Sequence, residues 1–242
     1  DTADYLTGRA THTASLEPRR FAETYCVQPE TRVDDDGKVV KFVRAGKHWL
    51  QYQDDHPDLT PLTKAQYDAA WNMQESIRKH QLAAEMLAEP GWFEVAITWD
   101  DALTGMRCKG RLDHFTKSGA IHDLKTSEDP SLRAFQNAAW RYRYHWQAAM
   151  YVDGIHAITG SYPRYFFIVP AKNPPIDVVV YRATEDFIQA GRDEYREALV
   201  KLQFCRARDE WPGMASEIVD LDLPAWAVQQ DEGSFAEMGI EL

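Results

Sequence analysis

The spacing of hydrophobic residues changes along the chain between two periods, and each period predicts a different kind of element. Alternation of apolar and polar residues, which is typical of a strand, covers residues 92–99, 107–116, 120–126, 165–171 and 176–183. Helical patterns cover residues 61–88, 131–153 and 185–208, with Thr60, Ser131 and Thr184 as the capping residues. The order helix, three strands, helix, two strands, helix predicts an α/β domain.

The first sixty residues predict helices followed by turns. One helical segment contains His12, and a short helix follows from Leu16 to Tyr25. The acidic runs DDDGK and DDHPD then flank the extended run KVVKFV. Asp36-Gly37, between two short apolar runs, is a turn signal that predicts a β-hairpin or lid.

Residues 108–126 place three charged side chains on two neighbouring strands. Asp113 lies in the first strand, and alternation puts Asp123 and Lys125 on one face of the second. Carboxylates are preferred ligands of hard divalent cations, and an ammonium nearby can orient or deprotonate a water or offset charge on a phosphoryl oxygen. This spacing fits a metal-dependent phosphodiester hydrolase, although an exposed hairpin with a surface ion pair would show the same pattern.

The helix predicted over residues 131–153 has a polar stripe and an apolar stripe. The polar stripe follows intervals of three and four residues and consists of Asn137, Trp140, Tyr144, Gln147 and Tyr151. The opposite stripe suits a core and consists of Phe135, Ala138, Ala139, Tyr142, Trp146, Ala149 and Met150. A glutamine and two tyrosines are unusual in a purely buried stripe, so we expect the polar stripe to face a cleft. For any one of these aromatic residues, simple packing is the alternative.

Composition and charge narrow the class of protein. The 242 residues suffice for one domain with a sizeable core. Three widely spaced cysteines indicate neither a disulfide framework nor a zinc site, and no apolar run reaches membrane-spanning length, so we expect a cytoplasmic protein. The formal net charge of −11 disfavours broad adhesion to nucleic acid. Basic residues cluster with aromatic ones around Arg141 and Arg143, which permits a basic cleft inside an acidic exterior, with a solvated helix face as the alternative.

Four short motifs in this order give the chain a family resemblance. They are G-R-A-T-H-T-A-S-L-E-P at 8–18, G-R-L-D at 110–113, D-L-K-T at 123–126 and Y-H-W-Q-A-A-M-Y at 144–151. With them the chain resembles the PD-(D/E)xK nuclease superfamily, in its RecE (exonuclease VIII) and lambda-exonuclease-like branch, over about residues 8–226. Leu112 stands where that family usually has a proline before the first aspartate. The resemblance implies a restriction-endonuclease-like core with a central mixed five-stranded sheet flanked by helices.

The resemblance also implies domain limits and residue roles. One domain would cover residues 1–242, with a helical part at 1–90, a nuclease core at 91–211 and an acidic tail at 212–242. Mg²⁺ or Mn²⁺ would be bound by His12, Asp113, Asp123 and the Leu124 carbonyl, with Glu94 as a further candidate. Lys125 would position or activate the attacking water, and Gln147 and Tyr151 would steady Lys125 or a DNA phosphate. The DNA contacts would be Arg141, Arg143 and Tyr144.

The function implied is an exodeoxyribonuclease that degrades linear double-stranded DNA from its ends in recombination, with a preference for 5′ ends. RecE-like enzymes further imply a homo-oligomeric ring, with a tetramer expected, and a single-strand annealing protein as partner. A Cas4-like or structure-specific endonuclease of the same superfamily is an alternative, although no four-cysteine iron–sulfur set is present. A non-catalytic DNA-binding module is a second alternative, against which the paired carboxylates argue.

Overall fold

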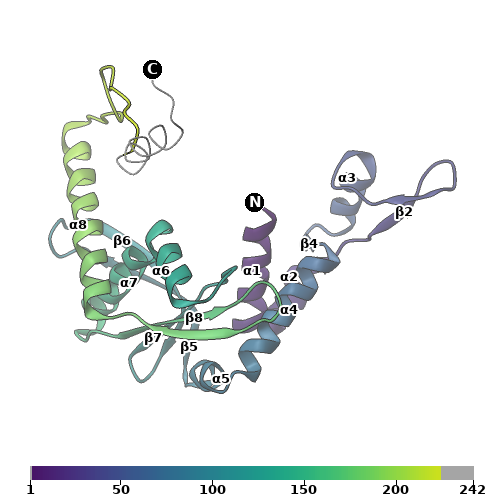
Figure 1. Cartoon of the computed structure of the whole chain (residues 1–242), viewed down its shortest axis with the longest axis horizontal. Coiled ribbons are helices and arrows are strands. Elements are labelled where there is room, and N and C mark those ends of the chain that lie inside the picture. Colours follow the sequence, from purple (N-terminus) through teal and green to yellow (C-terminus); the bar gives the residue numbers. More distant parts are fainter. Residues whose placement is uncertain (1, 225–242) are drawn as a thin grey trace, which may run out of the picture. The chain divides into compact units, whose positions relative to one another are not determined.

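A mixed five-stranded sheet organises the computed structural model, which describes residues 2–224 (Figure 1). Its strands follow the chain in the order β5 (Gly91–Asp100), β6 (Arg107–Thr116), β7 (Ala120–Leu124), β8 (Arg164–Pro170) and β9 (Val178–Arg182). Only β7 and β8 pair in parallel; the other neighbours are antiparallel. The predicted fold class, an α/β core with a mixed five-stranded sheet, is confirmed.

Helices pack against both faces of this sheet. On one face, α6 (Leu132–Arg141), α7 (Tyr144–Thr159) and α8 (Glu185–Arg208) enclose a core to which Leu112, Ile121 and Phe167 contribute from the strands. On the other, α4 (Lys64–Lys79) and α5 (Gln81–Ala88) cover Leu124 and Ile168. Since neighbouring residues of a strand face opposite sides, Asp123 belongs to the α7 side and Leu124 to the α5 side.

The N-terminal part builds a smaller core of its own. Helices α1 (Ala3–Leu16) and α2 (Pro18–Thr24) pack with α4 around Phe21, Leu62 and Ala70. The short strands β1 (Tyr25–Val27) and β4 (Thr60–Leu62) pair in parallel. Strands β2 (Thr31–Val33) and β3 (Val39–Lys41) form the predicted hairpin, and α3 (Gly46–Asp55) follows them. This core fixes α1, the helix that carries His12.

Two predicted helices are wrong in extent. The pattern over 61–88 predicted one helix capped by Thr60, but Thr60–Leu62 form β4, and α4 begins after Thr63 in a capping box with Gln66. This helix then ends at His80, whose Nδ1 accepts a hydrogen bond from the Ala83 amide at 3.1 Å and begins α5. Pairing with β1 satisfies the backbone of residues 60–62, which explains why the local helix signal did not prevail.

The helix predicted over 131–153 is also interrupted. Arg143 adopts a left-handed backbone conformation, φ 58° and ψ 38°, so α6 ends at Arg141 and α7 begins at Tyr144. The prediction of one polar stripe along a continuous helix is therefore wrong. Its first members, Asn137 and Trp140, lie on α6, and its later members lie on α7.

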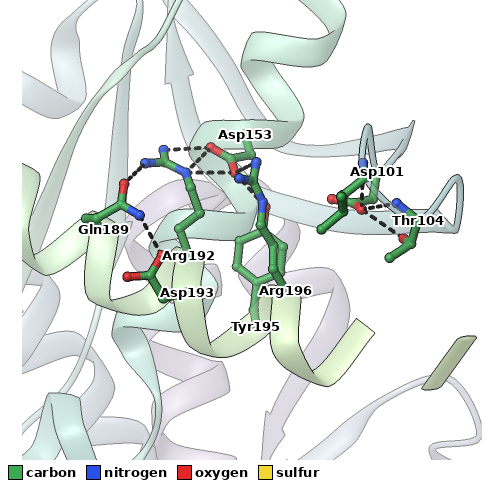
Figure 2. Close-up of polar contacts among 9 residues, drawn as sticks. Asp101, Thr104, Asp153, Gln189, Arg192, Asp193, Tyr195 and Arg196 are labelled. Atoms are coloured by element: carbon green, nitrogen blue, oxygen red, sulfur yellow. Dashed lines mark hydrogen bonds and ion pairs between the residues drawn. The ribbon is translucent and has the colours of Figure 1, made fainter. Parts of the chain in front are cut away.

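A buried carboxylate fixes α8 to α7. Asp153 accepts hydrogen bonds from Arg192, Tyr195 and Arg196, as Figure 2 shows. Gly191 permits this close approach, because a Cβ there would lie 2.0 Å from the His145 carbonyl oxygen. The same view shows Asp101, which accepts hydrogen bonds from Thr104 and stabilises the turn between β5 and β6.

By its contacts the chain divides into two compact units, residues 1–201 and residues from Leu202 on. Everything described below about the site lies in the first. The predicted acidic tail lies in the second, and its residues 225–242 are outside the described part. Among residues 2–224, no helix combines the length and apolar character needed to cross a membrane.

Candidate metal and catalytic site

The first group of the candidate site forms where α1 meets strands β5 and β6. Asp113 Oδ2 accepts a hydrogen bond from the Leu124 amide at 2.7 Å and lies 3.5 Å from Nδ1 of His12. The carboxylate of Glu94 completes the group, since one ligand atom from each of His12, Glu94 and Asp113 lies within 4.8 Å of the others. Three residues from separate parts of the sequence thus present two carboxylates and an imidazole to one point.

The backbone of Glu94 is distorted where this group forms. The β5–β6 ladder runs from Gly91 to Asp100 but has no pair between Glu94 and Asp113, and Glu94 has a φ of 52°. A left-handed glutamate in a strand is costly, and such strain is concentrated at functional sites. Burial and then the charge of Asp113 raise the pKa of Glu94, while Arg111 Nε approaches its carboxylate at 2.6 Å. The sequence pattern predicted a regular strand here.

Asp123 and Lys125 form a buried ion pair beside this group. The side chains are 1% and 13% exposed, respectively. Parallel pairing holds the lysine backbone, because the Lys125 amide donates to the Ile168 carbonyl at 3.0 Å. Burial raises the pKa of Asp123 despite the nearby ammonium; burial alone would lower the pKa of Lys125, but the charges of Asp123 and Asp113 outweigh it and raise that pKa. The sequence predicted that the two residues share one face, and in the structure their side chains are in contact.

The residues fit a divalent cation. Carboxylate oxygens with one imidazole suit Mg²⁺ or Mn²⁺. Of the two buried oxygens of Asp123, Oδ2 contacts the Lys125 ammonium, and Oδ1 has no hydrogen-bond partner among the described residues. Buried carboxylate oxygens normally require partners, and a cation would provide one. The three-residue group does not include Asp123. Its role as a ligand, and that of the Leu124 carbonyl, stay predictions.

The start of α7 surrounds the lysine. The Lys125 ammonium lies 5.1 Å from the centroid of the Tyr144 ring, in a cation–π contact. Gln147 Nε2 donates to the Tyr151 hydroxyl at 3.2 Å. The Tyr151 ring lies against Gly110 of β6, where a Cβ would come within 2.5 Å of it. Tyr144 of α7 therefore contacts Lys125. The expected support of Lys125 by Gln147 and Tyr151 stays a prediction.

A cavity of about 470 Å³ opens over the site. Its lining includes His12, Glu94, Asp113, Lys125 and Tyr144, together with Arg9, Arg20 and Arg111. None of these three arginines was predicted as a site residue; Arg9 and Arg20 meet the site only through the packing of α1 and α2. Tyr165 was also missed: its buried hydroxyl lies close to Asp123, and burial followed by that charge raises its pKa well above the usual value.

The predicted DNA-contacting arginines differ in their surroundings. Arg143 Nη1 donates to Glu194 at 2.8 Å, and its guanidinium lies over the rings of Trp140 and Trp146. Arg141 is exposed and lies 5.4 Å from the centroid of the Tyr142 ring. Both arginines are exposed, and both stay predictions as DNA contacts.

A sequence model of the family described as "PDDEXK-like domain of unknown function (DUF3799)" matches residues 1–222. The chain belongs to this family. The match agrees with Asp113 on β6, Asp123 on β7 and Lys125 directly after β7, the group from which the PD-(D/E)xK pattern takes its name. Members of this nuclease superfamily typically use a divalent metal, as the site described above would allow.

One solved structure shows the fold as well. A protein from Eubacterium rectale described as a "putative exonuclease" has 15% identity and a TM-score of 0.53, over 75% of this chain and 73% of its own. The structure of a protein named SSO0001 is 14% identical with a TM-score of 0.31, over 60% of this chain and 68% of its own, and that likeness is too low to bear on the argument. No curated protein sequence matches the chain.

Proposed function

We propose that this protein is a divalent-metal-dependent exodeoxyribonuclease that degrades linear double-stranded DNA from its ends. The observation that carries the proposal is the buried Asp123–Lys125 pair beside the His12, Glu94 and Asp113 group, where Lys125 and the three residues of that group line one cavity. A surface ion pair, the alternative that the sequence left open, does not account for side chains this buried. A module that only binds DNA has no need to hold carboxylates near a phosphate.

Each residue of the site has a distinct part in this proposal. A divalent cation, when bound, would polarise a phosphoryl oxygen and lower the pKa of a water. His12, Glu94 and Asp113 would hold it, with Asp123 contributing from the buried side. Lys125 would orient the water or neutralise charge on the phosphoryl oxygen, held in place by the ring of Tyr144.

The finer parts of the proposal rest on the resemblance to RecE-type nucleases. They are a 5′ preference, a homo-oligomeric ring that is expected to be a tetramer, and cooperation with a single-strand annealing protein. The likeness in fold to a protein described as an exonuclease agrees with the action on ends. An arginine-lined cavity in a chain of net charge −11 agrees with local rather than broad contact to DNA.

The deciding experiment compares linear and covalently closed circular duplexes of the same sequence, each with Mg²⁺ and with EDTA. We expect mononucleotides or short products from the linear form only, in Mg²⁺ only, and none from the Asp113→Asn protein. Efficient cutting of closed circles would instead assign an endonuclease. Binding without any cleavage in Mg²⁺ or Mn²⁺ would assign the non-catalytic module.

A further inference from the structure

Two stacked tyrosines, Tyr142 and Tyr144, lie at the break between α6 and α7, and we call this pair the aromatic step. Tyr142 is 58% exposed, and its ring stacks on that of Tyr144 with centroids 5.8 Å apart and planes inclined by 28°. The guanidinium of Arg141 lies 5.4 Å from the Tyr142 centroid. An aromatic ring that contributes to a core is normally covered, whereas this one presents a large part of its surface to solvent.

One ring of the aromatic step lies in the lining of the candidate site. Tyr144 lines the cavity, and its ring lies 5.1 Å from the Lys125 ammonium. Tyr142 is the next ring outward in the same stack. With a spacing of about 3.4 Å per stacked nucleotide, Tyr142 would lie within about three nucleotides of a phosphate at Lys125.

The turn that carries Tyr142 is held in place by its own contacts. Arg143 takes the left-handed conformation, which is strained for a residue with a side chain. Its guanidinium is fixed by Glu194 and by the rings of Trp140 and Trp146, and Trp146 Nε1 also donates to Glu194 at 2.7 Å. The aromatic step is therefore preorganised, which lowers the cost of binding a flat partner.

We propose that Tyr142 stacks on an unpaired base of the strand that enters the site, so that the preferred substrate is a DNA end with unpaired terminal nucleotides. This inference rests on the proposed function. Aromatic side chains stack on bases of any identity, and the face of a base is free for stacking when it is out of the duplex. A cavity of about 470 Å³ is of the size that encloses one drug-sized molecule, which suits a nucleotide or two rather than a base-paired duplex.

The test measures binding in EDTA, where metal-dependent cleavage does not occur. The probe is a short single-stranded DNA that carries the fluorescent base 2-aminopurine near its 5′ end. We expect the wild-type protein to quench the probe through stacking. Tyr142→Ala should weaken binding about five- to a hundredfold and abolish the quenching, whereas Tyr142→Phe should preserve both.

Tyr162→Ala is the matched control. Tyr162 is 63% exposed, stacks on His156 and has the Arg192 guanidinium 5.9 Å from its centroid, yet it does not line the site cavity. We expect wild-type binding from this variant. Because both tyrosines are exposed, neither substitution should prevent folding, and thermal melting of each variant checks this point.

A second measurement compares a blunt duplex with the same duplex carrying three unpaired nucleotides at one end. Wild-type protein should bind the unpaired end more tightly, and Tyr142→Ala should lose that preference. Equal affinity for the two ends, or a folded Tyr142→Ala protein that binds the single strand like wild type, would overturn the inference. Since both measurements are made without metal, a protein that binds unpaired ends but never cleaves them would refute the proposed nuclease and still support the stacking role.

Discussion

The buried Asp123–Lys125 pair allows a prediction in which stability and activity separate. Lys125→Met removes the ammonium but keeps an apolar stem of similar length. Asp123, which is 1% exposed, would then be left without its counter-charge. Breaking a buried pair from one side costs about 3–5 kcal/mol, a large share of the roughly 5–15 kcal/mol that stabilises a domain.

The stability that Lys125→Met loses relative to wild type should depend on pH, because protonation of Asp123 removes its uncompensated charge. Burial raises the pKa of Asp123 even with the lysine present, and without the ammonium that pKa rises further. The pKa of Asp123 in the folded protein is above its value in the unfolded chain, which is about 3.9, so its protonation favours folding. This contribution to stability is complete below the unfolded pKa and is lost as the pH rises through the folded-state pKa. The deficit of Lys125→Met relative to wild type should thus be small near pH 4 and largest at neutral pH.

Urea denaturation at pH 4.5 and pH 7.5 measures this effect. The double variant Asp123→Asn with Lys125→Met removes both charges and should recover at least about 1 kcal/mol at pH 7.5, as coupled neighbours do. Lys172→Met is the matched control. Lys172 pairs with Glu128 and Asp4, whose side chains are 61% and 79% exposed, so its loss should cost less than about 1 kcal/mol.

Activity should not follow stability in this set. DNA cleavage should fall by about 100-fold or more in Lys125→Met and remain low in the stabilised double variant, because the charge near the reacting phosphoryl group is absent from both. A Lys125→Met protein as stable as wild type at pH 7.5, with no dependence of the difference on pH, would refute the reasoning about the buried pair. Recovery of cleavage in the double variant would refute the role given to Lys125.

Three further predictions test other parts of the structure. Asp113→Asn should weaken Mn²⁺ binding, measured by calorimetry, by at least about tenfold, and unchanged affinity would remove Asp113 from the metal site. Gly110→Ala places a Cβ 2.5 Å from the Tyr151 ring, so it should cost about 1–3 kcal/mol in urea denaturation and lower cleavage; a neutral result would mean that this ring moves freely. Burial, then the neighbouring His114, lowers the pKa of His122 to about 4. Between about pH 6.5 and 4, His122 should therefore be protonated in the unfolded chain but neutral in the folded protein, so the free energy of unfolding falls by up to about 3 kcal/mol as the pH is lowered. His122→Leu should flatten this pH dependence of stability. An unchanged slope would contradict the low pKa assigned to His122.

The sequence alone determined the features that depend on neighbouring residues. Alternation located all five strands of the main sheet, because a strand with a buried face repeats every second residue. The same period put Asp123 and Lys125 on one face, and turn chemistry at Asp36-Gly37 located the β2–β3 hairpin. The resemblance added the expectation that His12 would meet Asp113, although they lie about a hundred positions apart; periodicity gives no such information.

The tertiary structure decided what depends on distant partners. Residues 60–62 pair as a strand because β1 lies beside them. The helix predicted over 131–153 breaks into α6 and α7 because Glu194 and two tryptophans hold Arg143 in a left-handed turn. The departure of Glu94 from its strand, and the approach of Tyr144 to Lys125, arise where separate elements converge. Local patterns report which side of an element is buried, but the partner that buries it is chosen by the packing of the whole chain, and that packing sets the charge, burial and strain of the candidate site.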